Sequence, residues 1–153
     1  MARRDRIEHE IVYPYRIEQV WAALTDAEQL SAWLMETDFT PGVGQRFAFF
    51  DHEPWPDGQL HDVVCEIVAC EPPRRLAYTW ASPPKLGPTL VEWRLSAIPE
   101  GTRVLLSHSG FAEYGDDGRE ALDVLRDGWG GLLAEKLRSH LERTFGPSDL
   151  NPQ

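Results

Sequence analysis

Hydrophobic and polar residues alternate along several stretches of the chain, which is typical of strands with one buried face. Val91, Trp93 and Leu95 show the pattern clearly, with charged or polar residues between them. Such alternation predicts six strands, over residues 7–13, 45–50, 60–71, 74–81, 89–98 and 102–110. Turn-forming Gly and Pro residues and acidic stretches predict loops over residues 51–58, 82–88 and 112–118. Because most turns between successive strands are short, we expect the strands to pair antiparallel.

Helical spacing of apolar residues appears in three other segments. Two short helices are predicted over residues 17–24 and 27–34, directly after the first strand, and one long helix over residues 119–145. Gly128, Gly130 and Gly131 weaken the long helix by up to about 1 kcal/mol each relative to Ala. We expect these glycines to permit a bend or a close backbone approach.

The order of these elements predicts an α+β fold. A curved antiparallel sheet of about six strands has one apolar face, and the long C-terminal helix supplies the cover that this face needs. We expect one domain over residues 1–146 and a frayed tail over residues 147–153. The space between the sheet and the helix is where a pocket is expected.

Composition narrows the classes of function. The chain has 153 residues, of which 42% are hydrophobic and 26% charged, which suits one globular domain. A net charge of −10 argues against nucleic acids and anionic lipid surfaces as partners. No apolar run approaches the roughly 20 residues of a membrane span. Cys65 and Cys70 fall on opposite faces of one predicted strand, so we expect free thiols and a cytoplasmic location.

Motifs for cofactor chemistry are missing from the sequence. There is no zinc-type spacing of Cys and His, no nucleotide-binding glycine loop and no GxSxG element, so we expect no cofactor and no metal. Residues 51–61 combine His52, His61 and carboxylates, which raises a metal site as an alternative to a lid loop. Trp55 on this segment is placed to close over a cavity mouth.

His108 is the most distinctive polar residue of the predicted inner face. It follows Val104 and Leu106 at alternating positions, so its imidazole points inward. There it is a candidate to hydrogen-bond a ligand or to act as an acid or base, together with the hydroxyl of Tyr78. The alternative is a histidine whose ring is satisfied by neighbouring protein groups.

Large aromatic side chains converge on the same predicted space, and Trp80, Trp93 and Trp129 are expected to meet there. They are interpreted either as the lining of a ligand pocket or as ordinary core, since both use the same residue types. The predicted ligand-binding residues are Trp33, Phe47, Trp55, Cys65, Tyr78, Trp80, Trp93, Leu106, His108, Trp129 and Leu133.

Several motifs occur in an order that resembles one known family. They are VWAALT at 20–25, Trp33, EPPRRL at 71–76, YTW at 78–80, VEWRL at 91–95, GTRV at 101–104, SHSGF at 107–111 and GW at 128–129. Together they resemble the START-like helix-grip (SRPBCC) superfamily, and within it the family of the activator of the 90-kDa heat-shock protein ATPase. The resemblance implies a helix-grip fold with a hydrophobic cavity. In relatives such cavities bind lipids, polyketides or other apolar molecules.

Three hypotheses for function follow. The first is binding of a small apolar or amphipathic ligand, such as a lipid, polyketide or polyphenol-like molecule, between the sheet and the C-terminal helix. The second is a cyclase- or hydratase-type enzyme that uses the same cavity with His108 or Tyr78. The third, suggested by the family name, is a stress-related or chaperone-associated protein-interaction module. The sequence leaves a protein partner, and the choice between monomer and homodimer, open.

Overall fold

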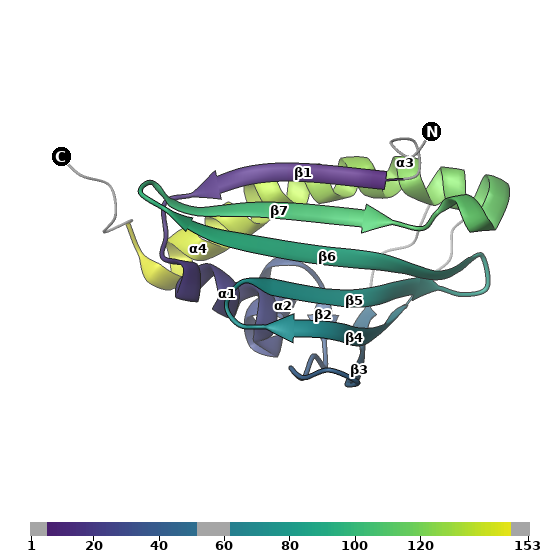
Figure 1. The fold of residues 1–153 in the computed structure, drawn as a ribbon, viewed down its shortest axis with the longest axis horizontal. Coiled ribbons are helices and arrows are strands. Elements are labelled where there is room, and N and C mark those ends of the chain that lie inside the picture. The colour runs from purple at the N-terminus through teal and green to yellow at the C-terminus, as the bar shows by residue number, and fades with distance from the viewer. Residues whose placement is uncertain (1–5, 52–61, 148–153) are drawn as a thin grey trace.

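A computed structural model of the chain describes residues 6–51 and 62–147. Seven antiparallel strands form one curved sheet in the order β1-β7-β6-β5-β4-β3-β2 (Figure 1). The strands are β1 (Arg6–Tyr13), β2 (Glu36–Thr37), β3 (Arg46–Phe50), β4 (Val63–Glu71), β5 (Arg75–Ser82), β6 (Leu86–Ile98) and β7 (Gly101–Ser109). The first strand therefore pairs with the last one and forms one edge of the sheet.

Two short helices, α1 (Ile17–Thr25) and α2 (Ala27–Trp33), connect β1 to β2. Asp26 lies between them, and its side chain accepts a hydrogen bond from the backbone N–H of Glu28, which caps the start of α2. Trp33 ends α2 and donates its indole N–H to the carbonyl of Ala23, 2.9 Å away. This bond holds the second helix against the first.

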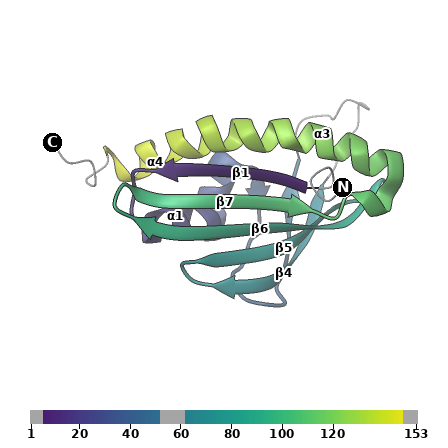
Figure 2. The same cartoon turned by 45° about the horizontal axis from the view of Figure 1, so that its top comes forward.

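The C-terminal part of the chain forms one long helical body that runs along the sheet (Figure 2). A single 3-10 turn, η2 (Ala112–Tyr114), leads into α3 (Gly115–Gly131), the π-helical segment η3 (Leu132–Leu137) and α4 (Arg138–Phe145). One side of this body and the inner face of the sheet bury a continuous apolar core. None of the helices in the described ranges is both long enough and apolar enough to cross a membrane.

The predicted α+β architecture and its antiparallel pairing are confirmed, and some boundaries are corrected. A seventh strand, β2, is added to the predicted six; it has two residues, too few for alternation to show. The long helix begins at Gly115 rather than residue 119, so most of the predicted loop over residues 112–118 is helical. Asp116 and Asp117 lie in its first turn, where carboxylates stabilise the helix dipole.

Two strand boundaries also differ from the prediction. The strand β6 begins at Leu86, inside the predicted loop over residues 82–88, because Leu86 pairs with Ser82 across a tight turn. The strand β4 begins at Val63; residues 60 and 61 of the predicted strand lie outside the described residues. Between the pairs Trp80–Thr89 and Ser82–Leu86 the register shifts, so β6 carries an extra residue there.

Candidate functional site

A cluster of aromatic rings fills the space between the sheet and the C-terminal helix. Trp80 and Trp93 come from the inner faces of β5 and β6, and Trp129 comes from α3. The ring centroid of Trp129 lies 5.3 Å from that of Trp80 and 5.6 Å from that of Trp93. Trp33 of α2 makes an edge contact with Trp93 at 6.3 Å. The three tryptophans expected to meet between the sheet and the C-terminal helix therefore lie together.

His108 lies inside this cluster in a chain of hydrogen bonds. The indole N–H of Trp129 donates to His108 Nδ1 at 3.1 Å. Thr89 Oγ1 lies 2.7 Å from His108 Nε2 and donates its one proton to the carbonyl of Trp80, also at 2.7 Å. His108 Nε2 must therefore carry a proton and donate it to Thr89, a tautomer assigned from the network.

The same surroundings fix the charge of this imidazole. The side chain of His108 is fully buried, and burial lowers its pKa from 6.5 to about 3. Both ring nitrogens are occupied by protein groups, and the ring stays neutral at physiological pH. His108 is therefore a histidine whose ring is satisfied by neighbouring protein groups, the second of the two possibilities raised from the sequence.

Tyr78 and Cys65 are buried near one another on neighbouring strands. The hydroxyl of Tyr78 accepts the indole N–H of Trp93 at 3.0 Å, and burial raises its pKa. Burial likewise raises the pKa of the Cys65 thiol, so it stays protonated. Both cysteines are free thiols. A protonated, buried thiol is a poor nucleophile, so Cys65 acts here as a small apolar side chain.

Two buried polar atoms stand apart from this satisfied network. Within the described ranges, Trp80 Nε1 and Ser82 Oγ are buried and have no hydrogen-bond partner. The two residues are two positions apart on β5, so strand alternation puts their side chains on the same face of the sheet. Buried polar groups in folded proteins are almost always paired, so these two atoms are exceptions among the described residues.

A pocket of about 750 Å³ opens beside the aromatic cluster, between α2, β2, the end of β3 and η3. Its apolar lining comes from Ala32, Trp33, Leu34, Met35, Phe50 and Leu132. Its polar lining comes from Ser31, Glu36, Asp51 and Lys136. The π-helical segment places Leu132 and Lys136 toward this pocket while Leu133 and Leu137 face the core. The pocket is thus amphipathic, with apolar and charged side chains both contributing to its lining.

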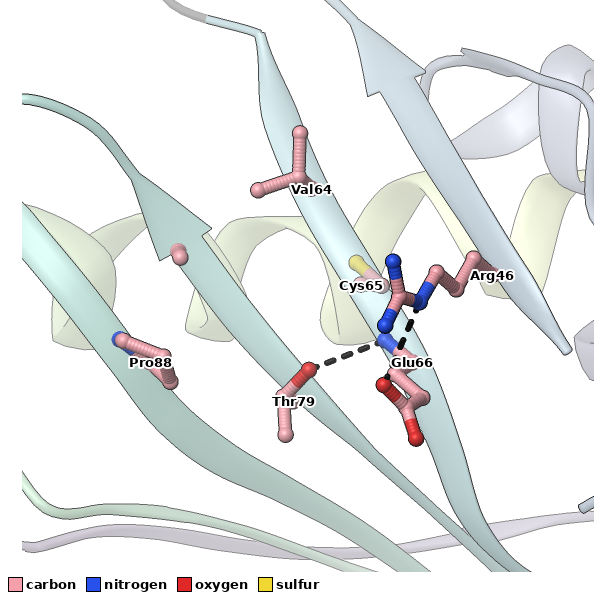
Figure 3. A pocket seen from close by; sticks show the side chains of 7 residues that line it. Arg46, Val64, Cys65, Glu66, Thr79 and Pro88 are labelled. Atoms are coloured by element: carbon pink, nitrogen blue, oxygen red, sulfur yellow. Dashed lines mark hydrogen bonds and ion pairs between the residues drawn. The ribbon is translucent and has the colours of Figure 1, made fainter. Parts of the chain in front are cut away.

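A smaller hollow of about 220 Å³ lies between β3, β4, β5 and β6 (Figure 3). Glu66 lies at its centre: its backbone N–H donates to Thr79 Oγ1 at 2.9 Å, and its carboxylate lies 3.4 Å from Arg46 Nε. The side chain of Arg46 is 84% exposed, so this ion pair is screened by solvent. The C-terminal helix lies behind the sheet in this view, on the other side from the labelled side chains. The volume of the hollow is below the roughly 300 Å³ at which typical ligand sites begin, which makes it the weaker candidate.

The predicted site residues divide between these places. Trp33 lines the larger pocket and Cys65 the smaller hollow. Trp55, like the rest of residues 52–61, lies outside the described residues. The remaining predicted residues are buried in the core, namely Phe47, Tyr78, Trp80, Trp93, Leu106, His108, Trp129 and Leu133.

Several lining residues were not singled out from the sequence. Met35, Phe50, Leu132 and Lys136 line the larger pocket. Leu132 and Lys136 do belong to the apolar spacing of the long helix, which was the only available signal for them. Met35 follows the predicted helix over residues 27–34, and Phe50 is the last residue of the predicted strand over residues 45–50, where periodicity says little about the direction of a side chain.

Comparison with known proteins places this fold in a family. Residues 14–142 match the family described as Activator of Hsp90 ATPase homolog 1-like protein. The chain belongs to this family. The resemblance seen in the sequence motifs is thereby confirmed. The match covers strands β2 to β7, the pocket and most of the C-terminal helix. A comparison with curated proteins gave no match.

Solved structures share the whole fold. Protein MLL2253 from Mesorhizobium loti is 31% identical, with 91% of this chain and 98% of that chain covered and a TM-score of 0.76. CalU16 from Micromonospora echinospora is 26% identical, with 92% and 78% covered and a TM-score of 0.70. DynU16, a protein in the dynemicin biosynthetic locus, is 23% identical, with 94% and 49% covered and a TM-score of 0.74. The last likeness concerns the fold alone.

Proposed function

We propose that this protein binds a small apolar or amphipathic molecule in the pocket between α2, β2, the end of β3 and η3. The observation that carries the proposal is the pocket itself, about 750 Å³ in volume. Ligand sites in proteins are typically about 300–1,000 Å³, mostly apolar, with a few polar groups. Trp33, Phe50 and Leu132 supply apolar surface, and Lys136, Glu36 and Asp51 supply charged groups, which suits an amphipathic ligand.

The family and fold are in keeping with a small-molecule ligand. The Activator of Hsp90 ATPase homolog 1-like family shares the helix-grip architecture, in which a sheet wraps a long helix. DynU16, a neighbour in fold, comes from a biosynthetic locus. The proposal is restricted to binding, because the two acid–base candidates, His108 and Tyr78, are both engaged by other side chains of the protein.

Filling the pocket tests the proposal. Ala32 lines it, whereas Ala134 is an exposed helical residue outside its lining, so Ala32→Trp and Ala134→Trp form a matched pair. The probe is 2-acetylnaphthalene, followed by quenching of tryptophan fluorescence and by native mass spectrometry. We expect Ala32→Trp to weaken binding by about tenfold or more, because the new indole occupies the space of the ligand. Ala134→Trp should leave the Kd within about twofold.

Two results would count against this function. One is the absence of a bound probe at any accessible concentration in the natural sequence. The other is equal loss of binding in both tryptophan variants, which would show that the loss does not depend on filling the pocket. Protein purified from its own host and sprayed under native conditions gives an independent test, because a retained molecule would add a discrete mass.

A further inference from the structure

Three residues with charged side chains line the larger pocket, and they come from the sheet and from the C-terminal helical body. Glu36 belongs to β2 and Asp51 follows the end of β3, whereas Lys136 belongs to η3. Glu36 pairs with Phe50, the residue before Asp51, so the two acidic residues occupy neighbouring positions at one edge of the sheet. The sheet side of the lining therefore carries negative charge and the helix side carries positive charge.

These opposite charges are not joined to one another. Among the described residues, Lys136 forms no ion pair, whether with Glu36, with Asp51 or with another acidic side chain. Glu36 and Asp51 each have an interaction partner within the protein. A carboxylate has about four lone-pair sites, so each of them can accept a further hydrogen bond. Both signs of charge in the lining can therefore bond to a ligand.

A ligand that fills the pocket displaces water from these three side chains. Lys136 and Glu36 are exposed, and Asp51 is half-buried. Taking a charged group out of water is strongly unfavourable unless a partner of opposite charge replaces the water. A wholly apolar ligand supplies no such partner. An anion alone meets two carboxylates of its own sign, and a cation alone leaves Lys136 uncompensated, so a ligand that matches the lining carries both signs of charge.

We propose that the ligand of this pocket is a zwitterion with an apolar body, in which an ammonium and a carboxylate group lie close together. Its ammonium group donates hydrogen bonds to Glu36 and Asp51, and its carboxylate accepts from Lys136. Its apolar body packs against Trp33 and Leu132, which line the same pocket. This inference rests on the proposed function and adds the class of ligand to it.

Three probes with the same naphthyl body separate the two charges. They are 3-(2-naphthyl)alanine, 3-(2-naphthyl)propanoic acid, which lacks the ammonium group, and 2-(2-naphthyl)ethylamine, which lacks the carboxylate. Isothermal titration calorimetry at pH 7 and low salt measures the Kd of each. We expect 3-(2-naphthyl)alanine to bind about tenfold more tightly than either single-charge probe, because it alone gives a partner to both sides of the lining.

Replacement of the lysine tests the carboxylate end. Lys136→Met keeps much of the apolar side chain and removes the charge, so it should weaken both carboxylate-bearing probes by about tenfold. It should leave 2-(2-naphthyl)ethylamine bound at least as tightly as before. Lys85→Met is the matched control, because it makes the same substitution at the other lysine of the chain, outside the lining. This control should leave all three Kd values within about twofold.

Replacement of the carboxylates tests the ammonium end. Glu36→Gln combined with Asp51→Asn should weaken both ammonium-bearing probes by about tenfold and leave 3-(2-naphthyl)propanoic acid bound at least as tightly. Glu100→Gln combined with Asp117→Asn makes the same change in charge at two exposed residues outside the lining. This control should leave the three Kd values within about twofold, because exposed distant charges are screened by salt.

The outcomes separate this inference from the function on which it rests. If 2-acetylnaphthalene binds and is lost in Ala32→Trp, but the three charged probes bind alike or not at all, the zwitterion assignment is overturned and the pocket stands. An effect of Lys136→Met without an effect of the double carboxylate variant, or the reverse, also overturns it, since only one charge of the ligand is then recognised. If the natural sequence binds neither 2-acetylnaphthalene nor any charged probe, both proposals fail.

Discussion

His108 links the sheet to the C-terminal helix through its two ring nitrogens. Trp129 of α3 donates to one of them, and the other donates to Thr89 of β6. Each bond is buried, so the loss of either partner would leave an unpaired polar atom at a cost of about 1–3 kcal/mol. A neutral imidazole is required, because a protonated Nδ1 could not accept from the indole.

This requirement predicts a pH dependence of stability. The pKa of His108 is about 3 in the folded protein, against 6.5 for an ordinary imidazole. Between these values the unfolded chain binds a proton that the folded protein does not. The free energy of unfolding therefore falls as the pH falls below the ordinary value, by about 1.4 kcal/mol per pH unit from this residue alone.

His108→Gln tests this dependence, since glutamine can accept from Trp129 and donate to Thr89 without titrating. Urea unfolding of both proteins from about pH 7 to pH 4.5 should show a shallower slope in the variant, by about 1.4 kcal/mol per pH unit. Parallel slopes in the two proteins would show that His108 binds its proton as readily in the folded protein as in the unfolded chain.

For single residues, the sequence predicted which side chains point inward but not which groups His108 bonds to. Alternation placed Val104, Leu106 and His108 on the inner face, and all three are fully buried. The partners of the imidazole come from residues 19 and 21 positions away. No local pattern encodes such pairings, because they depend on how β6 and α3 meet in space.

Among the elements, the long helix combines two kinds of glycine. Gly128 is exposed, and a Cβ added there would meet nothing within 4 Å. Gly118 is buried, and its added Cβ would lie 2.0 Å from the carbonyl oxygen of Phe111. The first glycine only weakens the helix, whereas the second permits a close approach between the start of α3 and the preceding turn.

Replacement by alanine should therefore change the free energy of unfolding in opposite directions at Gly128 and Gly118. Gly128→Ala is expected to raise the free energy of unfolding by about 1 kcal/mol through helix propensity. Gly118→Ala is expected to lower it by about 2 kcal/mol or more through overpacking against Phe111. Urea denaturation with helical circular dichroism measures both. A destabilised Gly128→Ala protein would contradict the open space seen around that residue.

The elements that the sequence missed share a physical reason. β2 has two residues and forms only because β3 lies beside it, pairing Glu36 with Phe50. The π-helical segment follows Gly130 and Gly131. The spacing of its apolar residues does not distinguish it from an α-helix. Both features line the larger pocket, so the pocket's position could not be read from the chain. The long, strongly periodic strands and helices could be predicted from the sequence, and they determine the fold.

The whole molecule is closed by contacts between its first strand and its last helix. At the end of β1, the hydroxyl of Tyr13 donates to the carbonyl of Leu133 at 2.6 Å. The guanidinium of Arg138 lies over the same ring, 5.2 Å from its centroid. Just beyond, the hydroxyl of Tyr15 donates to the carbonyl of Gly146 at 2.8 Å. The edge strand thus fixes the helix at its π-helical segment and at its end.

Removing the hydroxyls of Tyr13 and Tyr15 one at a time distinguishes an effect on the stability of the fold from an effect on the geometry of the pocket. Leu133 belongs to the segment whose neighbours Leu132 and Lys136 line the pocket, whereas Gly146 lies beyond the end of α4. Tyr13→Phe and Tyr15→Phe should each lower the free energy of unfolding by about 1 kcal/mol. Only Tyr13→Phe should also weaken binding of 2-acetylnaphthalene, by about threefold to tenfold, because it releases the pocket wall. Urea unfolding and fluorescence titration of the two variants measure these effects side by side. Equal binding in both would show that the edge strand stabilises the helix without positioning the pocket.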